Sequence, residues 1–134
     1  MLHSQRKKVI AAVIEKNNKV LIAQRAKKDS LYGKWEFPGG KMEHDETEHE
    51  CLQRELFEEF GIQAEIGPYL CSSYFEHNGV PMEMRVYYVR SFSGEFNLYD
   101  HQQIKWVDIR ELSSFDMPGP DKPIIEKLLF TGTQ

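Results

Sequence analysis

At 134 residues the chain has the length of one domain, so we expect residues 1–134 to fold as a single unit with one functional site. The content of 40% hydrophobic and 28% charged residues is ordinary for a globular protein and excludes a disordered or fibrous class. The net charge of -4 argues against a protein that binds long nucleic acid by neutralising phosphates, so a small ligand is the better expectation.

Cysteine usage and hydropathy predict a cytoplasmic protein. Cys51 and Cys71 are the two cysteines, and neither a CxxC motif nor a histidine spacing typical of zinc is present, which fits a reducing compartment. The apolar run of residues 9–14 ends at Glu15 and is too short for the core of a signal peptide or for a membrane span. We therefore expect no membrane association.

The first predicted elements are the two strands of a hairpin. Residues 9–14 form a continuous apolar run, which is typical of a strand covered on both faces. Asn17 and Asn18 then indicate a turn, and residues 19–25 have the pattern of the returning strand. This hairpin therefore predicts a strand pair inside a buried sheet.

A helix is predicted next. Thr47, followed three residues later by Glu50, matches a capping box and marks the start of the helix. Apolar residues then recur at every fourth position and form a packing stripe of Leu52, Leu56 and Phe60. Gly61 comes directly after this stripe and is expected to end the helix.

The second half of the chain predicts more strands and a final helix. Residues 69–76 are expected to pair with residues 82–92 around the turn His77-Asn78-Gly79, and residues 104–107 look like another short strand. A helix follows from about residue 121 to residue 129, with Pro123 in its first turn. The order of elements predicts an α/β (α+β) fold with a mixed β-sheet sandwiched between helices.

Three acids share one face of the first predicted helix. At about 100° per residue, Glu58 lies roughly 60° to one side of Glu55, and Glu59 lies roughly 40° to the other. Like charges this close repel one another, and no basic residue has the spacing to neutralise all three. A bound Mg²⁺ or Mn²⁺ would remove the repulsion, because carboxylate oxygens are the ligands that these ions prefer. The alternative is a solvated acidic face paired loosely with lysines.

The acids belong to a longer pattern. Residues 40–62 fit G-x5-E-x7-R-E-U-x-E-E-x-G-U, where U is an aliphatic residue, at every specified position. The chain thereby resembles the Nudix hydrolases, for which this pattern is the characteristic motif. The resemblance implies the Nudix fold over the single domain. It also implies an enzyme that uses water to cut the diphosphate linkage of a nucleoside diphosphate joined to another group.

Residue by residue, the resemblance makes Glu55, Glu58 and Glu59 the catalytic acids and metal ligands, without ranking them as the base that takes a proton from water. The implied cofactor is Mg²⁺, with Mn²⁺ as a substitute. The backbone carbonyl of Gly39 or Gly40 would provide a further metal ligand.

Two more residues of the motif receive supporting roles from the resemblance. Arg54 would be a catalytic residue that orients the acids. Glu46 would brace the preceding loop through Arg54 rather than bind the metal.

The similarity to the MutT-like branch of the family, which sanitises nucleotide pools, extends over nearly the whole chain. Residues 35–41 have the sequence Trp-Glu-Phe-Pro-Gly-Gly-Lys and resemble the approach to the motif in that branch. Arg25 stands at the place of an arginine that meets substrate phosphates, and the alternative is a surface partner for acids. Phe37 would line the base pocket, and the alternative is a purely structural place in the core.

Asp100 lies six residues before Trp106 and resembles a distal acid that adds one carboxylate to the metal site. Relatives often have Glu there, and the shorter Asp has less reach toward a metal. The neighbouring His101 is expected to be a surface or core histidine rather than a base.

Asp121 falls where the branch places an Asn or Asp that reads the base. An ionised carboxylate only accepts hydrogen bonds and would favour an amino group such as N4 of cytosine, whereas a protonated one also donates. The alternative is that Asp121 caps the helix that follows it.

The resemblance implies release of diphosphate from a nucleoside triphosphate, with oxidised guanine nucleotides such as 8-oxo-dGTP and cytidine nucleotides such as CTP as the first substrates to test. ADP-ribose, dinucleotides and the 5' end of RNA are alternatives within the family. A different class of function is a catalytically silent domain that binds nucleotides. The partner is therefore a small nucleotide, and the protein would be a monomer or a homodimer.

Overall fold

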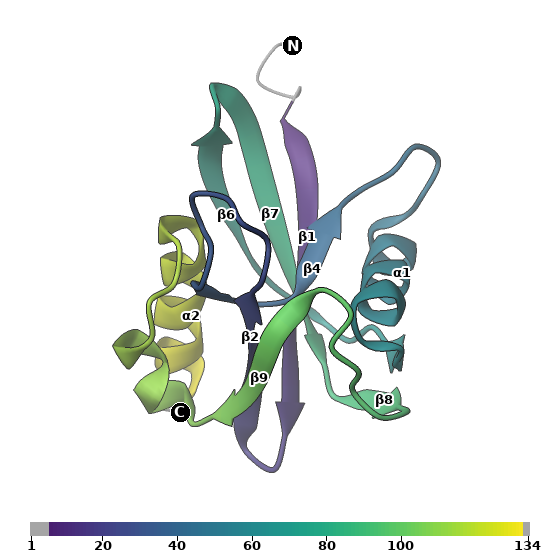
Figure 1. Ribbon diagram of the computed structural model, residues 1–134, viewed down its shortest axis with the longest axis vertical. Helices are drawn as coiled ribbons and strands as arrows, with labels where there is room; N and C mark the ends of the chain where they lie inside the picture. Colours follow the sequence, from purple (N-terminus) through teal and green to yellow (C-terminus); the bar gives the residue numbers. More distant parts are fainter. Residues whose placement is uncertain (1–5, 133–134) are drawn as a thin grey trace.

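A mixed sheet of seven strands lies between two helices, as the computed structural model shows for residues 6–132 (Figure 1). The sheet order is β3-β2-β1-β7-β6, with β4 also paired to β1 and β9 to β2, while β5 and β8 form a separate small sheet. The elements are β1 (Lys7–Lys16), β2 (Lys19–Arg25), β3 (Trp35–Glu36), β4 (Gly39–Lys41), α1 (Glu48–Phe60), β5 (Gln63–Glu65), β6 (Tyr69–His77), β7 (Val80–Val89), β8 (Ser91–Ser93), β9 (His101–Val107), the 3-10 helices η2 (Ile109–Ser114) and η3 (Gly119–Asp121), and α2 (Lys122–Gly132). The predicted fold class is confirmed.

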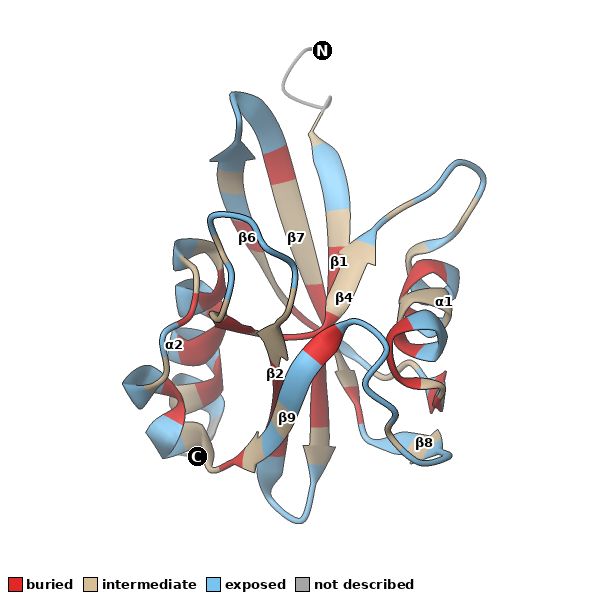
Figure 2. Ribbon diagram, in the orientation of Figure 1, coloured by how far each residue is buried: buried red, intermediate tan, exposed pale blue. Residues whose placement is uncertain are grey.

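β1 is the central strand and is buried on both faces, as its continuous apolar run predicts. Ala11 and Val13 face the core that contains α2, whereas Ile10, Ala12 and Ile14 face the core that contains α1. Figure 2 shows buried residues on the sides of both helices that face the sheet and exposed residues on their outer sides. Burial of a large apolar side chain such as Ile10 or Val13 contributes about 1.5–3 kcal/mol, so the cores on both faces stabilise β1.

One edge of β1 is divided between two partners, and this division shapes the site. Val9, Ile10 and Ala11 pair with β4, whereas Glu15 and Lys16 pair with β2. Between these pairings the backbone N–H of Ala12 donates to the carbonyl of Pro38 at 2.8 Å. The other edge of β1 pairs in parallel with β7. β4 is thereby held beside the first half of β1, and α1 is the next element after β4 in the sequence.

Both predicted turns have the backbone that their residues favour. Asn17 and Asn18 have φ values of 54° and 64°, and Asn78 and Gly79 have φ values of 52° and 80°. These left-handed conformations match the two-residue turns that join β1 to β2 and β6 to β7.

The prediction of one continuous strand over residues 82–92 is wrong. β7 ends at Val89, and β8 begins at Ser91 and pairs with β5 instead of with β6. The side chain of the intervening Arg90 pairs with Glu15 of β1 at 2.6 Å. Composition alone does not reveal this break, because strand-forming residues stand on both sides of it.

The start and end of α1 agree with the prediction. The hydroxyl of Thr47 accepts from the backbone N–H of Glu50 at 3.1 Å, and the carboxylate of Glu50 accepts from the N–H of Thr47 at 2.9 Å. Gly61 has φ 77° and ends the helix. The helix that carries the three acids is therefore defined at both ends by local sequence.

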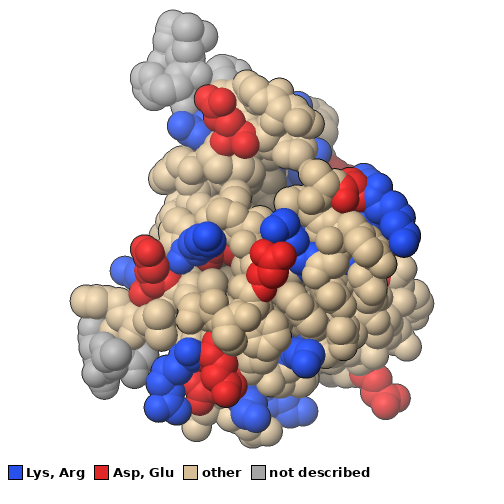
Figure 3. All heavy atoms as spheres, turned by 60° about the vertical axis from the view of Figure 1, so that its left-hand side comes forward, with Lys and Arg blue, Asp and Glu red and all other residues tan. Residues whose placement is uncertain are grey.

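α2 begins one residue after Asp121 and runs to Gly132, three residues beyond the predicted end, with Pro123 in its first turn. Within the described residues no helix is long and apolar enough to cross a membrane. The face of the molecule in Figure 3 carries Lys and Arg side chains interspersed with Asp and Glu, so this face provides no continuous basic stripe of the kind that tracks nucleic acid.

Candidate active site

A cleft of about 720 Å³ opens where β1, β4 and the end of α1 meet the loop before β9 and the segment before α2. This volume lies within the range of pockets that hold small molecules, roughly 300–1,000 Å³. The cleft gathers seven of the ten residues predicted for the site, which are Arg25, Phe37, Gly39, Gly40, Glu59, Asp100 and Asp121. The carboxylate of Glu55 lies beside Gly40. Arg54 donates hydrogen bonds to both Glu55 and Glu58 and so connects these two acids.

The two glycines of β4 let the backbone approach both the sheet and the acids. A Cβ at Gly39, whose φ is 153°, would overlap the carbonyl of Ile10. A Cβ at Gly40 would overlap the carboxylate of Glu55. Glycine at both positions therefore allows the backbone of β4 to lie directly between β1 and the acids of α1.

We expect Gly39→Ala to lower the free energy of unfolding by roughly 3 kcal/mol, because the added methyl group meets backbone atoms that cannot move aside and the backbone angle disfavours a side chain. Chemical denaturation followed by circular dichroism measures this change. Gly119→Ala is the matched control, since a Cβ there meets nothing within 4 Å. A Gly39→Ala protein as stable as the control would contradict the described packing of β4.

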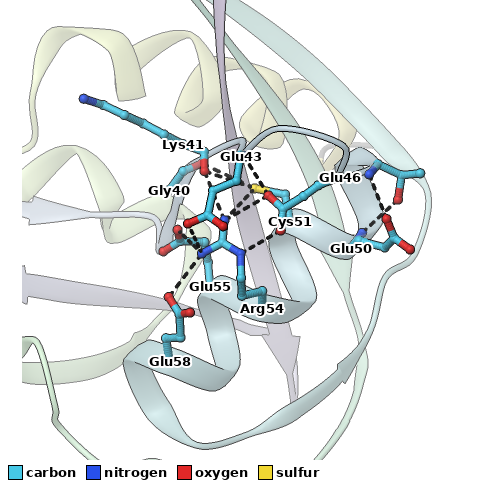
Figure 4. A network of polar contacts seen from close by, with 10 residues as sticks. Gly40, Lys41, Glu43, Glu46, Glu50, Cys51, Arg54, Glu55 and Glu58 are labelled. Atoms are coloured by element: carbon cyan, nitrogen blue, oxygen red, sulfur yellow. Dashed lines mark hydrogen bonds and ion pairs between the residues drawn. The ribbon is translucent and has the colours of Figure 1, made fainter.

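Arg54 holds the loop before α1 and two of the three acids (Figure 4). Its Nε and Nη2 donate to the two carboxylate oxygens of Glu46 at 2.6 and 2.9 Å, which confirms the predicted brace. Its Nη1 donates to Glu55 at 3.0 Å and to Glu58 at 3.1 Å. The hydrogen bond from Arg54 lowers the pKa of Glu46 to about 2. Within residues 6–132 no hydrogen bond or ion pair joins Arg54 to Glu59, so Arg54 does not neutralise the third acid of the face.

Glu59 is the buried acid of the site, with 7% of its surface exposed. Its Oε1 has no hydrogen-bond partner among residues 6–132. Burial, followed by the negative charges of Glu55 and Glu36, raises the pKa of Glu59 to about 10. Burial also raises the pKa of Glu55, although Arg54 opposes this shift. A buried carboxyl group with an unused oxygen is therefore available to a cation that enters the cleft.

The carboxylate and carbonyl oxygens of the site are the type of ligand that a hard divalent cation prefers. Within residues 6–132, however, no three His, Cys, Asp or Glu side chains already converge on one point. Glu58 is half exposed and, like Glu55, is turned toward Arg54. The carboxylates of Glu55, Glu58 and Glu59 and the carbonyls of Gly39 and Gly40 are the oxygens that could surround such an ion.

Glu36 lines the cleft between Arg25 and His101, and its sequence pattern did not single it out. The carboxylate of Glu36 accepts from Arg25 Nη1 at 3.2 Å and faces His101 Nε2 at 2.9 Å. Arg25 also pairs with Asp29 at 2.8 Å. Arg25 therefore lines the cleft, as a phosphate-binding arginine would, and it also pairs with acids, as the alternative interpretation states. Glu36 and His101 come together only through the pairing of β3 and β9 with β2.

Three buried side-chain polar atoms in the described part of the chain lack hydrogen-bond partners: Arg25 Nε, Glu59 Oε1 and His101 Nδ1. All three residues line the cleft. Because buried polar groups are nearly always paired, such a concentration indicates a place for a polar ligand. His101 is buried, as a core histidine would be, and its ring stacks on Phe60 with centroids 5.4 Å apart.

Phe37 and Asp121 are two buried residues that line the cleft. Phe37 is buried and belongs to the core on the α2 side, so it is at once a core residue and a wall of the cleft. Asp121 is 3% exposed, and its burial raises the pKa of the carboxyl group well above the usual range. Asp121 is the last residue of η3 and directly precedes α2, so the capping alternative stays open beside the base-reading one.

A sequence model of the NUDIX domain matches residues 4–128. The chain belongs to the NUDIX family. This Nudix protein is 36% identical over 121 residues to the CTP pyrophosphohydrolase of Escherichia coli (strain K12), and the match covers 90% of both chains. It is 32% identical over 122 residues to the 8-oxo-dGTP diphosphatase of Haemophilus influenzae, again with 90% of both chains covered.

The similarity extends to three dimensions. The solution structure of the E. coli ORF135 protein matches 96% of this Nudix chain and 93% of its own chain, with a TM-score of 0.87 and 35% identity. The motif of residues 40–62 therefore lies in the fold that the family resemblance implies. The Nudix enzymes generally require a divalent metal ion, and a small nucleotide substrate is consistent with the family.

Proposed function

We propose that the protein is a Mg²⁺-dependent pyrophosphohydrolase that converts a nucleoside triphosphate and water into a nucleoside monophosphate and diphosphate. The observation that carries this proposal is the junction of the α1 acids with a cleft of about 720 Å³ that also contains an arginine and a buried aspartate. One end of the cleft suits a polyphosphate with its cation, and the other end suits a base. The oxidised purine and cytidine nucleotides are the substrate groups that we favour.

The phosphate end combines carboxylates with basic side chains. Glu55, Glu58 and Glu59, with a carbonyl of Gly39 or Gly40, would hold the metal ion, while Asp100 would add a further carboxylate. A bound Mg²⁺ supplies positive charge against the diphosphate and lowers the pKa of a water molecule. Arg25, Lys27 and Lys41 line the cleft and would hold the phosphate oxygens.

The chain's own residues would prepare the attack by water on phosphorus. Arg54 holds the carboxylates of Glu55 and Glu58 in position before substrate arrives. One of the three glutamates would take the proton from water as the new P–O bond forms, while the diphosphate leaves with the electrons of the bond that breaks. Placing charged groups in advance is the main contribution of a protein to phosphoryl transfer.

The base end would use Asp121 and Phe37. Burial raises the pKa of the Asp121 carboxyl group well above its usual range, and a protonated carboxyl group can both donate and accept a hydrogen bond. Such a group pairs with a base edge that presents an acceptor beside a donor, as cytosine does through N3 and N4. Phe37 provides an apolar wall next to it.

The test is a hydrolysis screen with Mg²⁺ over CTP, dCTP, 8-oxo-dGTP, the other ordinary nucleoside triphosphates, ADP-ribose and capped RNA, compared by kcat/KM. The products are separated by chromatography, because ADP-ribose and capped RNA release no free diphosphate when they are cleaved. We expect a cytidine or oxidised purine triphosphate to exceed the other compounds by at least about tenfold. Faster cleavage of ADP-ribose or RNA would replace the substrate assignment. Tight nucleotide binding without turnover would favour the catalytically silent alternative.

A further inference from the structure

The loop between β8 and β9 is fastened to the end of α1. The backbone N–H of Asn97 donates to the carbonyl of Phe60 at 2.9 Å, and the N–H of Tyr99 donates to the carbonyl of Glu59 at 3.3 Å. The last carbonyls of a helix have no partners within the helix, so the loop satisfies groups that would otherwise face solvent. The acidic helix and the loop that ends in Asp100 are therefore joined by their backbones.

Asn97 makes the largest share of this connection. In addition to its backbone bond, its side-chain Nδ2 donates to the carbonyl of Phe60 at 3.3 Å and to the carbonyl of Glu95 at 3.1 Å. The side chain thus closes the loop on itself and onto the helix at the same point. Gly61 leaves room for this arrangement, because a Cβ there would lie 3.2 Å from Nδ2 of Asn97.

The rest of the loop has few constraints of its own. On one side Phe96 packs edge-on against Phe60, with ring centroids 5.3 Å apart, and on the other side His101 begins β9. Between these anchors the side chains of Leu98 and Tyr99 are exposed. The path of the chain from Phe96 to Asp100 therefore depends on the hydrogen bonds of Asn97 and Tyr99.

Asp100 lies at the place where this path reaches the α1 acids. Asp100 and Glu59 line the same cleft. The hydrogen bond from Tyr99 to the backbone of Glu59 places Asp100 one residue from that contact.

We propose that Asn97 is a positioning residue that fixes Asp100 beside Glu59, so that the distal carboxylate and the acids of α1 act around one cation. This inference rests on the proposed function. An aspartate reaches less far than a glutamate, so its backbone must be held at a defined distance if its oxygens are to join the site. Residues that hold a ligand in place commonly change metal affinity by about 10- to 100-fold when they are replaced.

The test is a titration with Mn²⁺ in the absence of nucleotide, followed by electron paramagnetic resonance of the free ion. We expect Asn97→Ala to weaken Mn²⁺ binding by about tenfold. Asn97→Leu, which keeps the volume of the side chain but has no donor, should give the same loss and replaces the first variant if that one does not fold. Gln103→Ala is the matched control, since it removes a hydrogen bond to Gln24 on β2 and does not involve α1.

A double-mutant cycle separates positioning from general loosening. If Asn97 acts through Asp100, Asn97→Ala should change Mn²⁺ affinity less than about twofold in a background that already carries Asp100→Asn. An equal loss in both backgrounds, an unchanged affinity of Asn97→Ala, an unchanged affinity of Asp100→Asn, or an equal loss in Gln103→Ala would overturn the inference. Absence of Mn²⁺ binding by the unmodified protein would instead remove the metal site of the proposed function.

Discussion

Glu58→Gln is expected to lower kcat for diphosphate release by about 1,000-fold while leaving the fold intact. Glu58 is half exposed, and it forms an ion pair with Arg54 four residues earlier on α1. Such a pair contributes about 0.3–0.5 kcal/mol to stability, so its loss changes the melting temperature little. The amide is neutral and is a poorer metal ligand than the carboxylate, so the loss appears in catalysis.

The comparison needs a control that removes the same charge elsewhere. Glu126→Gln, on the exposed side of α2, does so on the opposite face of the sheet from α1 and should leave kcat within about twofold. Steady-state kinetics at saturating Mg²⁺ and melting temperatures of both variants make the measurement. Near-normal turnover by Glu58→Gln would remove this residue from the catalytic machinery.

Glu59→Gln is the second replacement with a large expected effect, and it should change activity and stability in opposite directions. The uncharged amide occupies the same buried position, so we expect a loss of turnover of the same order as for Glu58→Gln. In a metal-free buffer near neutral pH, however, the variant should be more stable than the unmodified protein, because Glu59 ionises favourably in the unfolded chain but keeps its proton when it is buried.

The stability difference should depend on pH in a defined direction. Burial raises the pKa of Glu59 from 4.5 to about 10, so the folded state binds this proton more tightly than the unfolded state does. The resulting stability is fully present at low pH and is lost as pH rises through that interval. The advantage of Glu59→Gln should therefore grow between about pH 5 and pH 9, by up to roughly 1 kcal/mol per pH unit.

Melting curves in EDTA at several pH values measure this difference, with Glu126→Gln as the control. Addition of Mg²⁺ should then raise the melting temperature of the unmodified protein and not that of Glu59→Gln, since a ligand that binds only the folded state stabilises it. A stability difference that is constant across the pH range would show that folding does not raise the pKa of Glu59.

Local sequence signals were sufficient for the part of the site that lies on one helix. The capping box at Thr47, the apolar stripe and the stop at Gly61 are all interactions within a few residues, so the sequence predicts α1 and the shared face of its acids without reference to the rest of the chain. The brace between Arg54 and Glu46 spans eight residues and was predicted by family resemblance rather than by physical reasoning.

The opposite wall of the cleft depends on contacts between distant segments. Glu36 and His101 are 65 residues apart and meet because β3 and β9 both pair with β2. A single sequence contains no signal for such a register, and a glutamate beside a tryptophan has no distinctive pattern. For the same reason the pairing of β8 with β5 was missed, because the register of a short edge pair is set by tertiary packing.

The central claim is that the acids of α1 hold a divalent cation against the phosphates of a nucleotide. A crystal structure with Mn²⁺ and a slowly hydrolysed nucleoside triphosphate tests it directly, because the anomalous signal of manganese locates the ion. The ion should lie within about 2.5 Å of carboxylate oxygens from Glu55, Glu58 or Glu59, with the phosphates toward Arg25. A nucleotide bound in the cleft without any ion beside these three acids would contradict the claim.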